Sequence, residues 1–245
     1  MENLNIHSTN KTDKIIKVDK IVKESNTSKK YDMDCNNCNF ENDENEENEQ
    51  SVISNKLHEN DILLAGIRNL LVSLQNENNS INDEIVEKTP QRFLKAFSEL
   101  TSGYKVNVKK LIENALFDAE DYDDLIIIDD INFSSLCEHH LLPFNGKVSI
   151  AYVPDKKILG LSKFARIVQA YSNRLSLQER LTKQIVDCLN EYLKPKGCIV
   201  EINSKHACMC LRGIKSIDSI TKTIKSSGLF DKDENLMRKY ISLKK

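Results

Sequence analysis

The chain has 245 residues and a formal net charge of −2, with 35 basic and 37 acidic side chains. This length allows one large domain or two small ones that fold without disulfides. The balanced charge argues against a surface tuned as a whole to nucleic acid or an anionic membrane, so phosphate binding must be local. No stretch approaches the about 20 apolar residues that span a bilayer, and the N-terminus lacks a signal-peptide core. We therefore expect a cytoplasmic protein that binds neither nucleic acid nor membrane.

Residues 1–54 are rich in Asn, Lys, Asp and Glu and contain neither Gly nor Pro. Such a segment buries too little apolar surface to offset the entropy of ordering. The sequence therefore predicts a disordered extension at 1–54 and a catalytic domain at 55–245. Within the extension, Cys35 and Cys38 have C-x-x-C spacing, but no second pair completes a metal site, and we assign them no function.

Apolar residues recur at intervals of three and four from Ile62 to Leu74, which predicts an amphipathic helix. Thr89 and Pro90 are typical of an N-cap and a first helical residue, and they predict a second helix that Gly103 closes. Helices packed on a mainly antiparallel sheet would give an α+β domain. The other predicted elements are a short helix at 108–116, strands at 125–131, 148–152 and 198–202, and two helices within 162–193 that break near 175–176.

A cluster of Cys and His residues is the strongest chemical signal. Cys137 and His140 lie three positions apart, close enough to bind one ion from a single turn, and Cys208 offers a distant second thiolate. Three such ligands suit zinc, and they leave a position for a water whose pKa the metal lowers to about 7. The alternative is that the cysteines are buried small hydrophobes and the histidines hydrogen-bonded core residues.

Spacing alone does not choose the second thiolate. In a continuous strand, Cys208 and Cys210 would face the same side as His206. Either cysteine could then complete the metal site.

Basic groups follow these segments in the chain. Ser162 can cap a helix that carries Lys163 and Arg166, and Arg212 follows the second cysteine pair. A helix N-terminus with nearby Lys and Arg can hold phosphates. A solvated basic helix face is about as plausible for Lys163 and Arg166 alone.

Ser176 and Glu179 fit the S-x-x-E capping box, in which Glu179 reaches back to the Ser176 amide. A carboxylate could instead accept the N1 and N2 hydrogens of guanine. The pattern by itself favours the cap.

Four segments in order resemble the GTP cyclohydrolase I family. They are SLCEHHLLPF at 135–144, GLSKFARIV at 160–168, QERLTKQ at 178–184 and HACMCLRG at 206–213. The resemblance extends more weakly from the helix near Ile62 to Phe230 and leaves out the acidic extension. Four long motifs in one order are a specific signal.

The resemblance implies a tunnelling fold, in which α+β subunits pair their sheets into a barrel-like ring. Such rings are typically homodecamers of two stacked pentamers, with active sites between subunits. By motif position, Cys137, His140 and Cys208 would bind Zn²⁺, and His139 and His206 would transfer protons. The implied substrate-binding residues are Gln178 and Glu179 along the guanine, and Ser162, Lys163, Arg166 and Arg212 at the ribose and triphosphate.

The implied reaction opens GTP at C8, releases formate and closes the product to 7,8-dihydroneopterin triphosphate, the first step of pterin and folate biosynthesis. Two alternatives remain. A tunnelling-fold relative with other pterin or deazapurine chemistry would not need the Cys-x-x-His pair, and a zinc-stabilised scaffold would need a fourth ligand such as Cys210. One departure from the family is that residues 220–227 keep only part of its threonine-rich segment.

Overall fold

The computed structural model describes residues 46–75 and 81–244, with side chains from Asn60 onward. The sheet and the helices that cover it belong to one compact unit, Ser54–Lys245. Cys35, Cys38 and most of the predicted extension lie outside the described residues. Helix α2 (Glu46–Ser73) begins within the segment predicted to be disordered. Within the described ranges, no helix has both the length and the apolar character needed to cross a bilayer.

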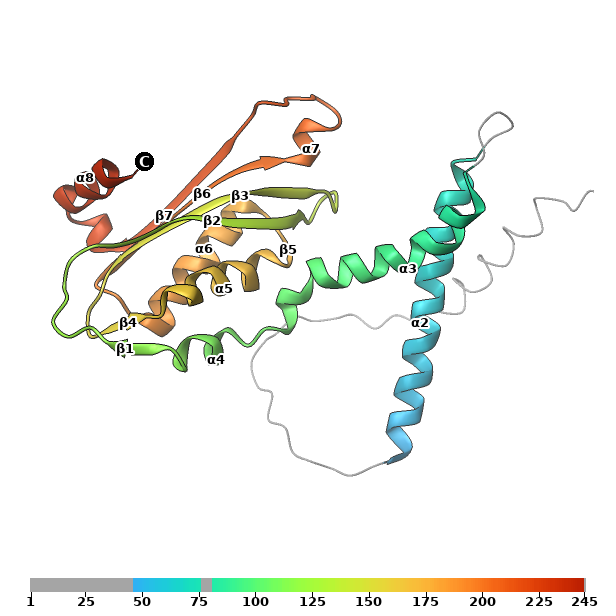
Figure 1. Cartoon of the computed structure of the whole chain (residues 1–245), viewed down its shortest axis with the longest axis horizontal. Coiled ribbons are helices and arrows are strands. Elements are labelled where there is room, and N and C mark those ends of the chain that lie inside the picture. The colour runs from blue at the N-terminus through green and yellow to red at the C-terminus, as the bar shows by residue number, and fades with distance from the viewer. Residues whose placement is uncertain (1–45, 76–80, 245) are drawn as a thin grey trace, which may run out of the picture. The chain divides into compact units, whose positions relative to one another are not determined.

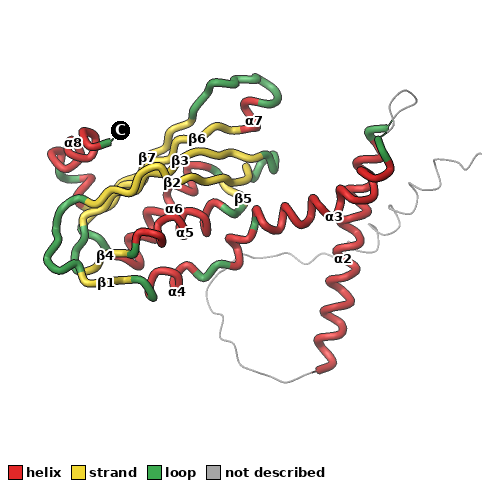
Figure 2. The backbone as a smooth tube through the Cα atoms, in the orientation of Figure 1, coloured by secondary structure: helices red, strands yellow, loops and turns green. Residues whose placement is uncertain are grey.

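A five-stranded sheet in the order β5-β2-β3-β6-β7 organises this unit (Figures 1 and 2). Three neighbouring pairs, β2-β3, β3-β6 and β6-β7, are antiparallel, while the short β5 joins β2 in parallel. With the helices that cover it, this sheet confirms the predicted α+β class. The strands are β2 (Ile126–Cys137), β3 (Pro143–Val153), β5 (Leu175–Ser176), β6 (Gly197–His206) and β7 (Thr221–Gly228), beside a separate pair, β1 (Leu116–Asp118) and β4 (Lys157–Leu159).

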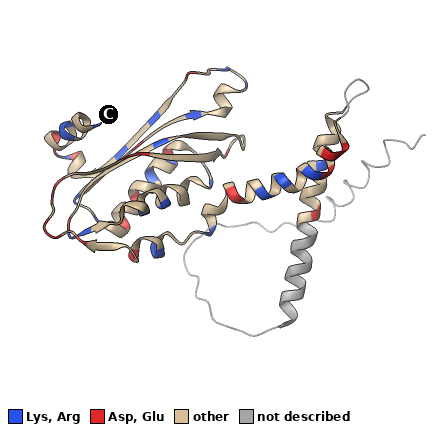
Figure 3. Cartoon of the chain, viewed as in Figure 1, with Lys and Arg blue, Asp and Glu red and all other residues tan. Residues whose placement is uncertain are grey.

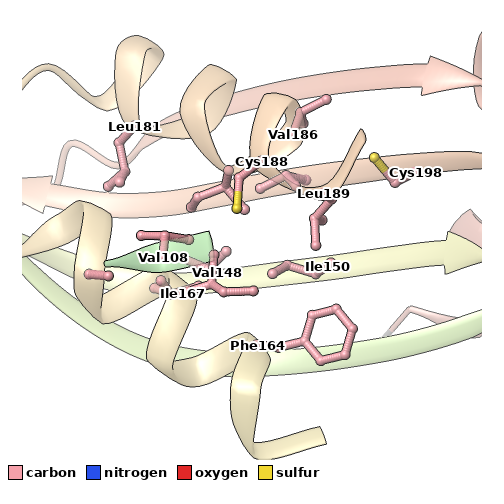
Figure 4. Packing of buried hydrophobic residues seen from close by; sticks show 14 of the residues in the cluster. Val108, Val148, Ile150, Phe164, Ile167, Leu181, Val186, Cys188, Leu189 and Cys198 are labelled. Carbon is pink, nitrogen blue, oxygen red and sulfur yellow. The ribbon is translucent and has the colours of Figure 1, made fainter. Parts of the chain in front are cut away.

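Two amphipathic helices cover one face of this sheet, α5 (Leu161–Ser172) and α6 (Gln178–Cys188), and a π-helical turn, η2 (Leu189–Leu193), continues α6. Phe164 and Ile167 of α5 lose all exposure to solvent. They pack in one cluster with Leu181 of α6 and with Val148 and Ile150 of β3 (Figure 4). Burial of these side chains is the main force that holds the helices on the sheet.

The opposite face of the sheet carries a smaller apolar cluster. Ala151 and Val153 alternate with the residues of β3 that face α5 and α6, so their side chains point the other way. They pack with Phe230 in the turn η3 (Leu229–Asp231) and with Tyr240 of α8 (Glu234–Leu243). Just after α8, Lys244 forms an ion pair with Glu201 of β6, which ties the C-terminal segment to the sheet.

The second helix begins earlier than predicted. Helix α3 (Asp83–Leu100) starts after Asn82, whose side chain accepts a hydrogen bond from the Glu84 amide at 2.8 Å. Two acidic residues in the first turn also suit the positive end of the helix. Pro90 therefore lies inside the helix, and the predicted start at Thr89 is wrong because a stronger cap precedes it.

The short helix that follows, α4 (Val108–Glu113), ends before the predicted residue 116. Between α3 and α4 lies a 3-10 turn, η1 (Ser102–Lys105). Basic and acidic residues both occur along α3 and α8, so neither helix presents a charge of one sign (Figure 3).

Candidate metal centre and active site

The candidate ligands come from neighbouring strand ends. Strand β2 ends at Cys137, and β6 ends at His206, just before Cys208 in the short helix α7 (Ala207–Cys210). Phe144 at the start of β3 lies between them, paired with Ser135 on one side and with His206 on the other. The antiparallel register therefore brings two segments that are 70 residues apart to one edge of the sheet.

Cys137, His140 and Cys208 form a group whose ligand atoms all lie within 4.8 Å of one another. The Cys137 Sγ and His140 Nδ1 atoms are 3.8 Å apart. Ligands at about 2.1 and 2.3 Å from a tetrahedral zinc ion would lie about 3.6 Å apart, so this donor set fits zinc in both type and spacing. Burial raises the pKa of the Cys208 thiol, and the neighbouring Cys137 raises it further.

Cys210 faces away from this group. Its Sγ atom lies 3.4 Å from the Ser216 carbonyl oxygen and 3.8 Å from that of Ile217. The strand stops at His206, and the helical turn of α7 breaks the alternation that would have placed both cysteines on one side. Among the residues that the structure describes, no fourth Cys, His, Asp or Glu joins the group.

The turn that carries His140 is held by backbone and side-chain contacts. The Leu141 amide donates to the Cys137 carbonyl oxygen at 2.8 Å, and Leu141 has a left-handed φ of 54°. Glu138 forms a two-point ion pair with Arg180 of α6, and the hydrogen bond from Arg180 lowers the pKa of Glu138. Both residues lie inside the family motifs, but no local pattern in the sequence predicts that they pair.

His206 is half-buried next to the metal-ligand group. Its ring stacks on Phe144 with centroids 4.6 Å apart and planes within 2°, and its Nε2 atom lies 2.9 Å from Gln178 Oε1. Burial lowers the pKa of His206, and the Glu179 carboxylate acts in the opposite direction. The ring is therefore fixed in plane and position by two contacts.

The start of α6 differs from the predicted capping box. Leu177 is the N-cap residue, no side chain caps the helix, and the Ser176 hydroxyl donates to the Leu177 carbonyl oxygen. The capping prediction is wrong because Ser176 belongs to β5, one residue before the N-cap position. Glu179 is exposed and close enough to His206 to affect its pKa, whereas Gln178 is only 1% exposed and hydrogen-bonded within the protein.

Two further predicted residues lie at the exposed side of this edge. The His139 side chain is 62% exposed, and its ring centroid lies 6.2 Å from that of His140. Arg212 is exposed just beyond α7, near enough to Cys208 to favour the thiolate. Both side chains are therefore open to solvent beside the candidate metal-ligand group.

Ser162, Lys163 and Arg166 lie elsewhere, in the first half of α5. Ser162 does not cap the helix, because Gly160 is the N-cap residue and no side chain accepts from the free amides. The other end of α5 leads into β5, which pairs with β2 at Cys137. Ser162 lies ten residues before the last residue of α5, or about 15 Å along the helix axis, so one chain does not gather all the predicted residues.

The sequence model of the GTP cyclohydrolase I family matches residues 65–245. The chain belongs to this family. A GTP cyclohydrolase 1 from Chlorobium chlorochromatii is 44% identical over 174 residues, which cover 71% of this chain and 78% of that protein. The GTP cyclohydrolase 1 of a Synechococcus species (strain JA-2-3B'a(2-13)) is 46% identical over 65% of this chain and 69% of its own length.

These GTP cyclohydrolase relatives make the chain a member of an enzyme family, and the candidate metal-ligand group lies within the matched residues. Among solved structures, the archaeosine synthase QueF-Like in its apo form aligns with 42% of this chain and 93% of its own, at 20% identity and a TM-score of 0.36. That likeness is too weak to bear on the function.

Proposed function

We propose that this protein is a GTP cyclohydrolase I, which opens the imidazole ring of GTP at C8, releases formate and forms 7,8-dihydroneopterin triphosphate. The observation that carries the proposal is the group Cys137, His140 and Cys208 beside His206, in a chain of this family. Three protein ligands are typical of catalytic rather than structural zinc sites. The product would enter pterin and folate biosynthesis.

Zn²⁺ is the metal that we propose for this group. Two thiolates and an imidazole are a soft to borderline donor set, which favours zinc over magnesium or calcium. When bound with three protein ligands, zinc activates water near neutral pH. The Arg180 and Glu138 ion pair would hold the ligand-bearing turn in place for the metal.

His206 and His139 are the proposed proton-transfer groups. His206 is held by Phe144 and Gln178, so it could deliver a proton to purine nitrogen N7 when C8 is attacked. His139 is exposed and less restrained, which suits the later transfers during rearrangement and closure. Glu179 would accept hydrogen bonds from the guanine edge, and Arg212 would contact the triphosphate.

We further propose that a complete site forms between subunits. Ser162, Lys163 and Arg166 would bind ribose and phosphates, yet they lie about 9 to 15 Å along α5 from the end of that helix that adjoins the candidate metal-ligand group. A second chain could bring its own α5 to the site. In the described part of the chain, β7 and most of β2 each have one strand neighbour, so sheets could pair edge to edge in a ring, as the family's homodecamers do.

The domain limits are part of the same proposal. Residues 55–245 would form the catalytic domain of a cytoplasmic enzyme, and residues 1–54 would be a dispensable extension. Deleting residues 1–53 should leave GTP turnover unchanged. Loss of turnover would assign the extension a role in catalysis or assembly.

The proposed reaction is tested by incubating the purified, zinc-loaded protein with GTP. We expect stoichiometric release of formate together with a fluorescent pterin after oxidation of the product. Formate without pterin would mean ring opening without closure. If neither appears although zinc is bound, the proposed reaction is wrong, and the zinc-stabilised scaffold becomes the better account.

The role of Glu179 is tested by the Glu179→Gln variant. Because the amide cannot accept both guanine hydrogens as a carboxylate does, we expect the KM for GTP to rise at least about tenfold while thermal stability stays nearly unchanged. A stability loss with a normal KM would instead assign Glu179 a structural role at the start of α6.

A further inference from the structure

The Gln178 side chain is buried, and both ends of its carboxamide are engaged. Its Nε2 atom donates to the carbonyl oxygens of Ile202 and Thr221 at 3.0 and 3.1 Å and lies 3.1 Å from Thr223 Oγ1. Its Oε1 atom accepts from the Ser204 hydroxyl at 2.6 Å and lies 2.9 Å from His206 Nε2. Every polar atom of this side chain therefore has a protein partner.

These partners fix which end of the amide is which. Carbonyl oxygens only accept hydrogen bonds, so the NH₂ group must face Ile202 and Thr221. The opposite orientation would bury Oε1 against the carbonyl oxygens of Ile202 and Thr221 and remove the donor that Nε2 supplies to them, at a cost in a buried site. The Oε1 atom consequently faces His206.

The orientation of the amide in turn fixes the histidine. Because Oε1 only accepts, the 2.9 Å contact requires a hydrogen on His206 Nε2. The neutral ring then carries its lone pair on Nδ1. The parallel stack on Phe144, itself 1% exposed, holds the plane of the ring, and a half-turn of the ring would put carbon Cε1 in place of Nε2 and lose the hydrogen bond to Gln178.

We propose that Gln178 is a positioning residue that holds His206 as the Nε2–H tautomer and leaves Nδ1 as the nitrogen that exchanges a proton with the substrate. The inference rests on the proposed function only for the substrate's identity. In that reaction the Nδ1–H bond of the protonated ring breaks and its electron pair stays on Nδ1. The proton is transferred to purine N7, where a new N–H bond forms with the N7 lone pair. The Nε2–H bond to Gln178 is unchanged throughout the step.

This role replaces the guanine contact that the family resemblance implies for Gln178. A side chain that is 1% exposed with all its polar atoms engaged would have to break several of these hydrogen bonds to reach a base. Glu179, the next residue, is exposed and remains free to contact the substrate. The two neighbours thus have different roles.

The hydrogen-bond network also gives β7 a role at the site. Thr182 of α6 donates to the Gln178 carbonyl oxygen at 2.8 Å and lies 2.6 Å from the Thr223 hydroxyl. Thr223 can therefore donate to Thr182, and its oxygen can share a hydrogen of the Gln178 NH₂ group with one of the two carbonyl oxygens. Both threonines of residues 220–227 therefore contact Gln178, Thr221 through its carbonyl oxygen and Thr223 through its hydroxyl.

The tautomer can be measured directly in the full-length, zinc-loaded protein. Solid-state ¹⁵N NMR on histidine-labelled protein, at a pH where the ring is neutral, distinguishes Nε2–H from Nδ1–H, and the His206→Asn variant assigns the signals. We expect Nε2–H in the wild-type protein and a mixture of tautomers in Gln178→Met. A wild-type ring with its hydrogen on Nδ1 would overturn the inference, whatever the activity, because this measurement needs no turnover.

Steady-state kinetics separate positioning from substrate contact. Gln178→Met keeps the side-chain volume, and we expect kcat to fall at least about 100-fold with a KM for GTP within about threefold of wild type. The matched control is Ser204→Ala, which removes the other donor to Oε1 but leaves the bond to His206, and it should keep most of kcat. An unchanged kcat with a raised KM in Gln178→Met would mean that Gln178 contacts guanine. Failure of the proposed function would appear differently, as absence of pterin from the wild-type protein.

Discussion

The two halves of the predicted site differ in how one chain builds them. At the metal end, the side chains proposed for metal binding and proton transfer each contact several other residues. They are held by the register of the strands, by the ion pair between Arg180 and Glu138, and by the hydrogen bonds of Gln178. At the phosphate end, Ser162 and Arg166 are exposed on the surface of α5, without a side-chain cap at its N-terminus.

This contrast indicates which contacts a single chain forms by itself and which contacts we expect a second chain to supply. Metal binding and proton transfer would depend on sub-ångström placement, and the residues that we propose for them lie in one network around the ends of β2 and β6. Basic side chains can attract a triphosphate from a distance by charge, before direct hydrogen bonds form. A second chain can therefore supply the phosphate contacts without disturbing the chemistry.

The largest expected effect comes from removing a metal ligand. Cys208→Ser should weaken zinc binding by roughly 1000-fold or more and abolish pterin formation, because one of three donors is lost. Cys210→Ser is the matched control and should bind zinc normally, since its thiol faces the Ser216 carbonyl oxygen. Competition with a chelator measures both affinities. Equal losses in the two variants would mean that both cysteines bind the metal.

A smaller effect is expected at the ion pair behind the metal-ligand turn. Arg180→Met frees Glu138, so zinc affinity should fall by about 10- to 100-fold, as for other residues that orient metal ligands. Lys183→Met removes an exposed pair with Asp187 on the same helix and should leave the affinity unchanged. If both variants bind zinc like the wild type, the turn is rigid without Arg180.

The smallest effect on the site is expected from the opposite face of the sheet. Burial raises the pKa of Glu201, but hydrogen bonds from Lys244 and Asn203 outweigh this, so its pKa is lowered. Glu201→Gln should therefore reduce the unfolding free energy by about 1 to 3 kcal/mol at pH 7 and leave zinc affinity unchanged.

The pH dependence of Glu201→Gln follows from that sign. Because the pKa of Glu201 is lower in the folded than in the unfolded chain, the ionised carboxylate stabilises the fold at pH values above its unfolded-state pKa of about 4.3. This stabilisation is lost as the pH falls through the folded-state pKa of Glu201. The difference in unfolding temperature between variant and wild type should thus close below about pH 4. Glu234→Gln, in an exposed pair, should show little difference at any pH, and a persistent gap for Glu201→Gln at low pH would contradict this account.

Much of the fold could be predicted from the spacing of apolar residues and from the residues that typically begin or end helices and strands. The break near 175–176, the strand around Val148 and the α+β class follow from local patterns that tertiary packing reinforces. Helix starts failed where a better cap competed, as Asn82 did with Thr89. In all three failures, at Thr89, Ser162 and Ser176, a side chain that suits a cap was not at the N-cap position.

For the candidate site, too, local patterns predicted some features and long-range contacts decided the others. The Cys137 and His140 pair follows from spacing within one turn, whereas the choice between Cys208 and Cys210 depends on where β6 ends, which alternation does not reveal. The partners of Gln178 come from three separate elements, so no local pattern could have predicted them. These contacts depend on how distant strands and helices pack together, which a single sequence does not show.

A mixing experiment tests the central claim most directly, that GTP chemistry occurs at a site made by two chains. Cys208→Ser removes the metal end, and Arg166→Ala combined with Lys163→Ala removes the phosphate end, so each variant alone should be inactive. If subunits dissociated, mixed equally and reassembled at random, about one site in four would combine an intact metal end with an intact phosphate end from its neighbour. We predict pterin formation at about a quarter of the wild-type rate. No recovery, in mixtures shown to contain both variants in one oligomer, would contradict the shared site.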